Sequence, residues 1–251
     1  MKTRFFHRKA FTIIELLVVI GIVAVLVGIL LPVLASAIDR SRRVGSEANL
    51  RSIATVFDLY IDDSRGQYPA SVEGVLYQTP RSYLRAGLPY WQSADQWNLL
   101  FHDRYPWESN INMFLAPGAE RDLSMLPLMS TIFPSYQYSA TFLGDPRIWS
   151  GGDITSDEWD GLLGSVRRSA VRYPSGKVLL WDVELPTIRR DLERDLYSNL
   201  NEQSPMVFAD GHTEVRVPAR ANEGVTNWAH TATHPHQYLH NTRDGVFGRD
   251  Y

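Results

Sequence analysis

The chain of 251 residues contains no cysteine and carries little net charge. The lack of cysteine excludes disulfide bonds, thiolate zinc sites and cysteine nucleophiles, and leaves the redox compartment undetermined. A formal charge of -3 is not the basic footprint of a nucleic-acid-binding protein, so no nucleic acid partner is expected. Hydrophobic residues nevertheless make up 44% of the chain, which predicts a folded protein rather than a disordered one.

The common catalytic motifs are also missing. The chain has no Gly-rich phosphate loop, no Gly-x-Ser-x-Gly elbow and no His-Glu-x-x-His zinc motif. We therefore expect a protein that is not an enzyme and that needs no cofactor.

Polar side chains are missing from one long stretch near the N-terminus. From Ile13 to Leu34, Glu15 is the only polar residue, and the stretch would form a helix about 33 Å long, enough to cross a bilayer. Arg40, Arg42 and Arg43 follow this segment, so counting charges alone does not fix its orientation. A short basic leader without an acid favours a cytoplasmic N-terminus and an extracytoplasmic head. Its basic residues are Lys2, Arg4, Arg8 and Lys9.

Two ordinary interpretations of this segment compete. A secretory signal peptide would have its cleavage site at Ala35-Ser36-Ala37. The apolar region of signal peptides, however, usually spans only about 7–15 residues and contains no acid, whereas the stretch here is longer and contains Glu15. A plain signal anchor explains the length but not Glu15.

The stretch from Lys9 to Leu16, Lys-Ala-Phe-Thr-Ile-Ile-Glu-Leu, resembles the processing site of type IV pilins and type II secretion pseudopilins. The resemblance implies that a prepilin peptidase cuts between Ala10 and Phe11 and methylates the new amine of Phe11. The family usually has Gly where this chain has Ala10, so slower processing is expected.

The resemblance also implies a role for Glu15 in assembly. A carboxylate within a membrane helix costs about 2.5–3.5 kcal/mol and normally has a partner. In family filaments, this Glu is thought to meet the terminal amine of a neighbouring subunit. The alternative interpretation is an acid tolerated near the headgroups, where the helix dipole favours it.

Beyond the apolar run the helix becomes amphipathic. Leu50, Ile53, Ala54, Phe57 and Ile61 follow helical spacing and mark one apolar face. We expect one helix over about residues 12–62. The predicted organisation is a leader over 1–10, a pilin-type helix over 11–63 that spans the membrane at about 13–34, and a globular head over 64–251.

A second resemblance covers the end of this helix and part of the head. Asn49-Leu50, Asp62-Asp63 and Tyr68-Pro69 are similar to pilin-like proteins of planctomycete and related bacteria. Those proteins carry a C-terminal region with a His, nine residues and Asp-Gly. Asp210-Gly211 matches the end of that pattern, but Leu200 stands where the His is expected.

The head is expected to be an antiparallel sheet wrapped on the helix, which makes the fold class α+β. Residues 177–182 form a short apolar run that predicts a buried strand. Residues 205–209 and 213–217 flank Asp210-Gly211, a strong hairpin signal. Residues 70–165 show no clear periodicity and are expected to be loops with short elements.

Two groups of residues are weak metal candidates. The first group consists of four closely spaced histidines, whose imidazoles could bind a transition metal. They are His230, His234, His236 and His240. Calcium could be held by Asp182, Glu184 and Asp210, although it needs 6–8 oxygen ligands.

The function expected from the sequence is that of a prepilin-like structural subunit of a type IV pilus or a type II secretion pseudopilus. Its expected partners are prepilin peptidase, other pilin-like subunits, the inner-membrane assembly machinery and the membrane. Its expected location is the bacterial inner membrane, followed by a filament. The alternative is a signal-anchored extracytoplasmic protein that binds sugar, metal or a protein partner.

Overall fold

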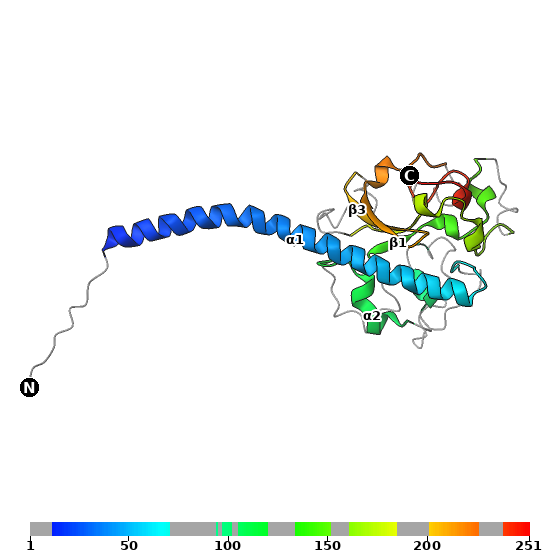
Figure 1. Cartoon of the computed structure of the whole chain (residues 1–251), viewed down its shortest axis with the longest axis horizontal. Helices are drawn as coiled ribbons and strands as arrows, with labels where there is room; N and C mark the ends of the chain where they lie inside the picture. Colours follow the sequence, from blue (N-terminus) through cyan, green and yellow to red (C-terminus); the bar gives the residue numbers. More distant parts are fainter. Residues whose placement is uncertain are drawn as a thin grey trace, which may run out of the picture. The chain divides into compact units, whose positions relative to one another are not determined.

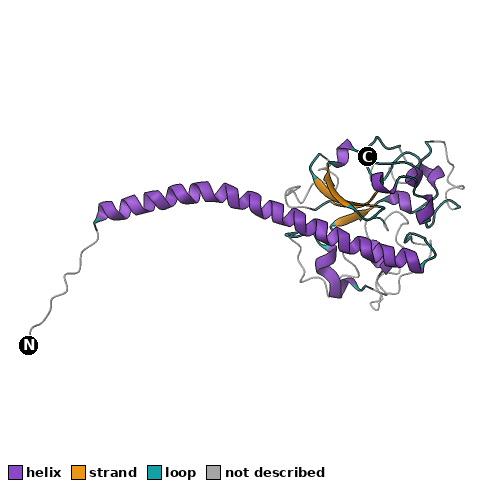
Figure 2. Cartoon of the chain, viewed as in Figure 1, coloured by secondary structure: helices purple, strands orange, loops and turns teal. Residues whose placement is uncertain are grey.

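A computed structural model describes residues 12–70, 94, 97–101, 105–119, 134–151, 161–184, 201–225 and 238–251. Its helices and strands are drawn in Figures 1 and 2. The chain divides into two compact units, Met1–Ser41 and Arg42–Tyr251. The chain contains the long helix α1 and a four-stranded antiparallel sheet, which makes the protein α+β, as predicted.

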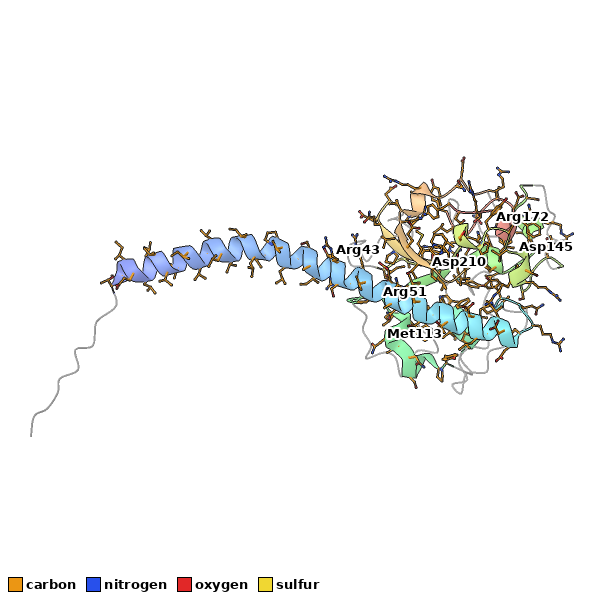
Figure 3. All side chains as sticks on the ribbon, in the orientation of Figure 1. Arg43, Arg51, Met113, Asp145, Arg172 and Asp210 are labelled. Carbon is orange, nitrogen blue, oxygen red and sulfur yellow. The ribbon has the colours of Figure 1, made fainter. Side chains whose placement is uncertain are left out.

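Helix α1 spans Ile13–Asp63 and confirms the single helix expected over residues 12–62. Its N-terminal part is long and apolar enough to cross a membrane. The large apolar side chains from Ile13 to Leu34 are all exposed, and Figure 3 shows them as sticks along the helix. Pro32 lies inside the helix, where it cannot donate a backbone hydrogen bond.

The C-terminal half of α1 buries one face. Leu50, Ile53, Ala54, Phe57 and Ile61 are at most 5% exposed, which confirms the apolar face predicted from their spacing. An α-helix returns the same face to the core every three or four residues. The positions on its other faces point away from the core and can carry polar side chains.

Helix α1 ends in a turn formed by Arg65 and Gly66. Arg65 and Gly66 both have positive φ, a conformation that glycine adopts without strain. The Gly66 N–H donates to the Ile61 carbonyl at 2.8 Å and so satisfies one of the last carbonyls of the helix. Arg168 then donates to the carboxylates of Asp58 and Asp62, which ties a later segment to the last turns.

The sheet has the order β1-β2-β3-β4, and every pair is antiparallel. Its strands are β1 Tyr136–Tyr138, β2 Val178–Asp182, β3 Ser204–Phe208 and β4 Thr213–Arg216. Strands β3 and β4 form the hairpin predicted from Asp210-Gly211. Gly211 has φ +87°, and its N–H donates to the Phe208 carbonyl at 2.9 Å.

Two of the elements that the structure describes within residues 70–165 were not located from the sequence. One is β1, and the other is the short helix α2, Trp107–Phe114. All three residues of β1 are buried, and a strand of three residues is too short to show a periodic pattern in the sequence. A short 3₁₀ helix, Trp97–Phe101, precedes α2 in the chain.

Apolar residues pack on both faces of the sheet. Val207 belongs to the cluster that includes α1, while its strand neighbours Met206 and Phe208 belong to a second cluster. This division follows from the alternation of side chains along a strand. At the centre of the first cluster, the Phe57 ring lies 4.9–5.5 Å from the rings of Trp97, Phe101 and Tyr138.

Polar contacts fix the helix on the sheet next to this core. The buried Ser46 hydroxyl donates to the Asp182 carboxylate at the end of β2. One turn later the Asn49 amide donates to the Leu115 carbonyl at 3.0 Å and to the Tyr136 hydroxyl at 3.1 Å. Burial raises the pKa of Tyr136 well above its usual value, and the Asp182 charge raises it further. The phenol therefore stays a neutral hydrogen-bonding group.

Phe57 and Leu59 provide a matched test of this core, because they lie two residues apart on α1 but only Phe57 is buried. In a fragment starting at Arg42, Phe57→Ala should lower the free energy of unfolding by about 3–5 kcal/mol, since it opens a cavity among three rings. Leu59→Ala should change it by no more than about 0.5 kcal/mol. Urea titration followed by tryptophan fluorescence measures both. Equal losses, or a fragment without a cooperative transition, would contradict the core described above.

Candidate functional site

The start of α1 is capped by three reciprocal hydrogen bonds between Thr12 and Glu15. The Glu15 Oε2 atom accepts from the Thr12 backbone N–H at 2.9 Å and from the Thr12 hydroxyl at 2.8 Å. The Thr12 Oγ1 atom in turn accepts from the Glu15 N–H at 3.2 Å. This is a capping box, in which Thr is the N-cap and Glu stands three residues later.

The capping box gives Glu15 a function within a single subunit. It satisfies two of the N–H groups that the first turn of a helix leaves without a partner. An acid in the first turn also lies at the positive end of the helix dipole. The interpretation of Glu15 as a favourable residue at a helix start is therefore supported, and it leaves room for a second role in assembly.

Ala10 and Phe11 lie outside the described residues, so the predicted cleavage site is defined by the sequence alone. In the sequence, Phe11 directly precedes the N-cap residue Thr12. Cleavage before Phe11 would thus place the new amine one residue from the capping box and four residues from Glu15.

His240 is used inside the head. It is buried, its Nδ1 accepts from the Ala140 N–H at 3.1 Å, and its Nε2 lies 3.2 Å from Gln137 Oε1. Its ring also meets the edge of Trp181 at a centroid distance of 4.6 Å. Both nitrogens already have protein partners, so His240 is placed as a structural residue rather than as a ligand. His230, His234 and His236 lie outside the described residues.

The three calcium candidates are not brought together. Asp182 ends β2 and Asp210 follows β3, and the pairing of Val178 with Phe208 places them at opposite ends of these strands. Asp210 Oδ1 contacts His212 Nδ1 at 2.5 Å, and Glu184 Oε2 accepts from Ser135 at 2.6 Å. Among the described residues, no group of three or more His, Cys, Asp or Glu side chains could hold a metal ion.

Comparison with protein families identifies a known motif at the N-terminus. Residues 6–31 match the family described as the prokaryotic N-terminal methylation motif. The matched residues include Ala10, Phe11 and Glu15. Comparisons with curated proteins and with solved structures found no match. The chain thus carries the N-terminal motif of prepilin-like proteins, consistent with a type IV pilin- or pseudopilin-like protein.

Thr12 is the residue of this site whose role was not recognised from the sequence. The signal was present, because Thr12-Ile13-Ile14-Glu15 has the Thr-x-x-Glu spacing of a capping box before an apolar run. The same four residues lie inside the methylation motif, so one short sequence contributes both to processing and to the start of the helix.

Proposed function

We propose that the protein is a structural subunit that is processed at Ala10/Phe11 and assembled through α1 into a type IV pilus or a type II secretion pseudopilus. Before assembly it lies in the bacterial inner membrane with a cytoplasmic N-terminus and an extracytoplasmic head. The supporting observation is that the methylation motif coincides with the start of a 51-residue helix whose N-terminal side chains are exposed.

The exposed apolar side chains support a membrane and then a filament as their surroundings. Transfer of a Val, Leu or Ile side chain from water to an apolar environment is favourable by about 1.5–3 kcal/mol of free energy. The helix exposes such residues all around its first half, so an environment that surrounds it completely is favoured over one that covers a single face. Lipid supplies that environment first, and the helices of neighbouring subunits supply it in the filament.

Glu15 supports assembly rather than simple anchoring. The capping box holds its carboxylate but leaves its negative charge without an opposite charge among the described residues around it. The ammonium group of a processed Phe11 on a neighbouring subunit has the required charge. The pair would fix the register between adjacent helices, since each subunit carries one acid and one amine at this level.

The head is proposed to have a structural role. The chain lacks the common catalytic motifs, and the buried polar groups of the head hold the helix on the sheet. The partners proposed for the subunit are prepilin peptidase, further pilin-like subunits and the assembly machinery of the inner membrane.

The test is the chemical state of the N-terminus in protein from its own cell. We expect mass spectrometry of the membrane and sheared-surface fractions to find an N-methylated Phe11. An N-terminus at intact Met1 would instead support a signal-anchored binding protein. A start near Ile38 or Asp39 would show signal-peptide cleavage, and either result would overturn the proposal.

A further inference from the structure

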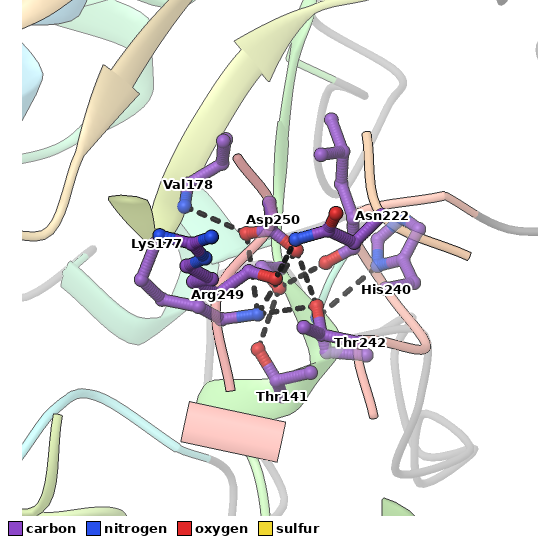
Figure 4. Close-up of polar contacts among 11 residues, drawn as sticks. Thr141, Lys177, Val178, Asn222, His240, Thr242, Arg249 and Asp250 are labelled. Carbon is purple, nitrogen blue, oxygen red and sulfur yellow. Dashed lines mark hydrogen bonds and ion pairs between the residues drawn. The ribbon is translucent and has the colours of Figure 1, made fainter. Parts of the chain in front are cut away.

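Lys177 and Asp250 form a buried pair in the head, and neither residue belongs to the N-terminal motif. Lys177 directly precedes β2, and its side chain is fully buried; Asp250 is 1% exposed. The Lys177 Nζ lies 3.3 Å from each oxygen of the Asp250 carboxylate. Figure 4 shows the two side chains meeting end to end. The methylation motif and the proposed function of α1 make no use of this pair.

Two further groups hold the Asp250 carboxylate in a defined orientation. The Val178 backbone N–H donates to Asp250 Oδ2 at 2.8 Å. The Thr242 hydroxyl accepts from Lys177 Nζ at 2.5 Å and donates to Asp250 Oδ1. Thr242 therefore connects the amine to one carboxylate oxygen, while a backbone donor polarises the other (Figure 4).

Burial weakens the preference of the Lys177 amine for its charged form. It lowers the pKa of the Lys177 amine, although the charge of Asp250 opposes the effect. Two charges removed from water lose several kcal/mol of hydration each, so a buried ion pair has little advantage over a neutral one. Transfer of one proton along the Lys177–Thr242–Asp250 hydrogen bonds would convert the pair to a neutral amine and a neutral carboxylic acid. These are the two reactants of an amide condensation.

We propose that Lys177 and Asp250 become joined by an intramolecular isopeptide bond. The Nζ lone pair attacks Cγ of the protonated Asp250 side chain, and the Val178 N–H stabilises the developing charge on Oδ2. The second proton of Nζ passes through the Thr242 hydroxyl to Oδ1. The Cγ–Oδ1 bond breaks, one water molecule leaves, and an amide N–H remains. The condensation changes no oxidation state and needs no co-reactant.

The bond would give the head a covalent link that its composition otherwise lacks. The chain has no cysteine and therefore no disulfide. An isopeptide at this position closes a ring from the start of β2 to Asp250. It would also fix residues 238–251 to the sheet against pulling or unfolding. The bond depends only on the folded head, so it can form whether or not the subunit assembles.

Tryptic digestion of the full-length protein, purified in detergent from membranes, tests the bond directly. Trypsin cuts after Arg172 and Arg249 but not after a lysine whose amine is acylated. We expect a branched peptide in which residues 173–189 carry, on Lys177, the tryptic peptide that begins at Asp250, lighter by one water than the two parts. An unlinked pair instead yields residues 173–177 and the free peptide that begins at Asp250. Complete recovery of these unlinked peptides would overturn the proposal.

Three variants separate the bond from the ion pair. Lys177→Arg keeps the positive charge but cannot condense, because the guanidinium stays protonated; we expect no branched peptide. Asp250→Ala removes the acyl donor and should give the same result. Thr242→Val keeps the size of the side chain without the hydroxyl, and the branched fraction should fall sharply. A Thr242→Val protein linked as fully as the natural chain would overturn the proton path through Thr242.

Discussion

Protein carrying Ala10→Leu should keep its leader, and the fraction processed to Phe11 should fall close to zero. A peptidase site that accepts a small side chain before the scissile bond rejects a branched one by steric clash. The sequence resemblance predicts cleavage directly after Ala10, which lies within the motif match over residues 6–31. Since the membrane segment is unchanged, the uncut protein should still be inserted. Gel mobility and the mass of the N-terminal peptide measure the processed fraction.

Ala10→Gly is the matched control for this change. Gly is the residue that the related processing sites usually have, so this variant should be cut at least as well as the natural chain. Leader retention in Ala10→Leu together with normal processing of Ala10→Gly would show that side-chain size controls the step. Maturation of Ala10→Leu to Phe11 would contradict the assignment of a prepilin peptidase.

The elements with strong local signals could be predicted from the sequence. The apolar spacing of Leu50, Ile53, Phe57 and Ile61 defined the buried face of α1, because a helix returns the same face every three or four residues. Asp210-Gly211 defined the β3–β4 hairpin, because its turn needs a residue with positive φ. Both signals lie within a few residues of the structure they specify.

The elements that depend on distant partners could not be predicted. Strand β1 has three residues, and it is a strand because Gln137 pairs with Trp181 on β2. His240 looked like part of a histidine cluster, yet its environment is set by Ala140 and Gln137. In the same way, nothing in the sequence near Lys177 indicates that Asp250 and Thr242 will surround its amine. These contacts arise from tertiary packing.

At the candidate site the sequence identified the residue but only part of its chemistry. Glu15 was singled out because an acid within an apolar run needs a partner. Its partner within the subunit is Thr12, through the capping box. The two roles of Glu15, capping and assembly, therefore predict different effects for different substitutions.

Glu15→Gln should leave insertion and processing intact but strongly reduce filament recovery. Gln keeps the capping box, since its amide oxygen can accept from the Thr12 N–H, but it removes the charge that would pair with the Phe11 amine. Leaving one member of a desolvated ion pair without its partner costs about 3–5 kcal/mol, so recovery should fall by at least about tenfold. Glu15→Leu should insert into the membrane at least as well as the natural chain, because it removes a charge from the apolar segment. Its filament recovery should be no higher than that of Glu15→Gln.

Thr12→Val provides the converse change, because it removes the capping hydroxyl and keeps the Glu15 charge. Loss of an N-cap costs about 0.5–2 kcal/mol, and the backbone N–H of residue 12 still reaches the carboxylate, so the effect on assembly should be the smaller one. Filaments sheared from cells, measured with the processed fraction and with cross-linking between subunits, compare the variants. If fully processed Glu15→Gln or Glu15→Leu protein assembles normally, Glu15 is only a helix cap. If Thr12→Val is as defective as Glu15→Gln, the start of the helix, rather than the charge, controls assembly.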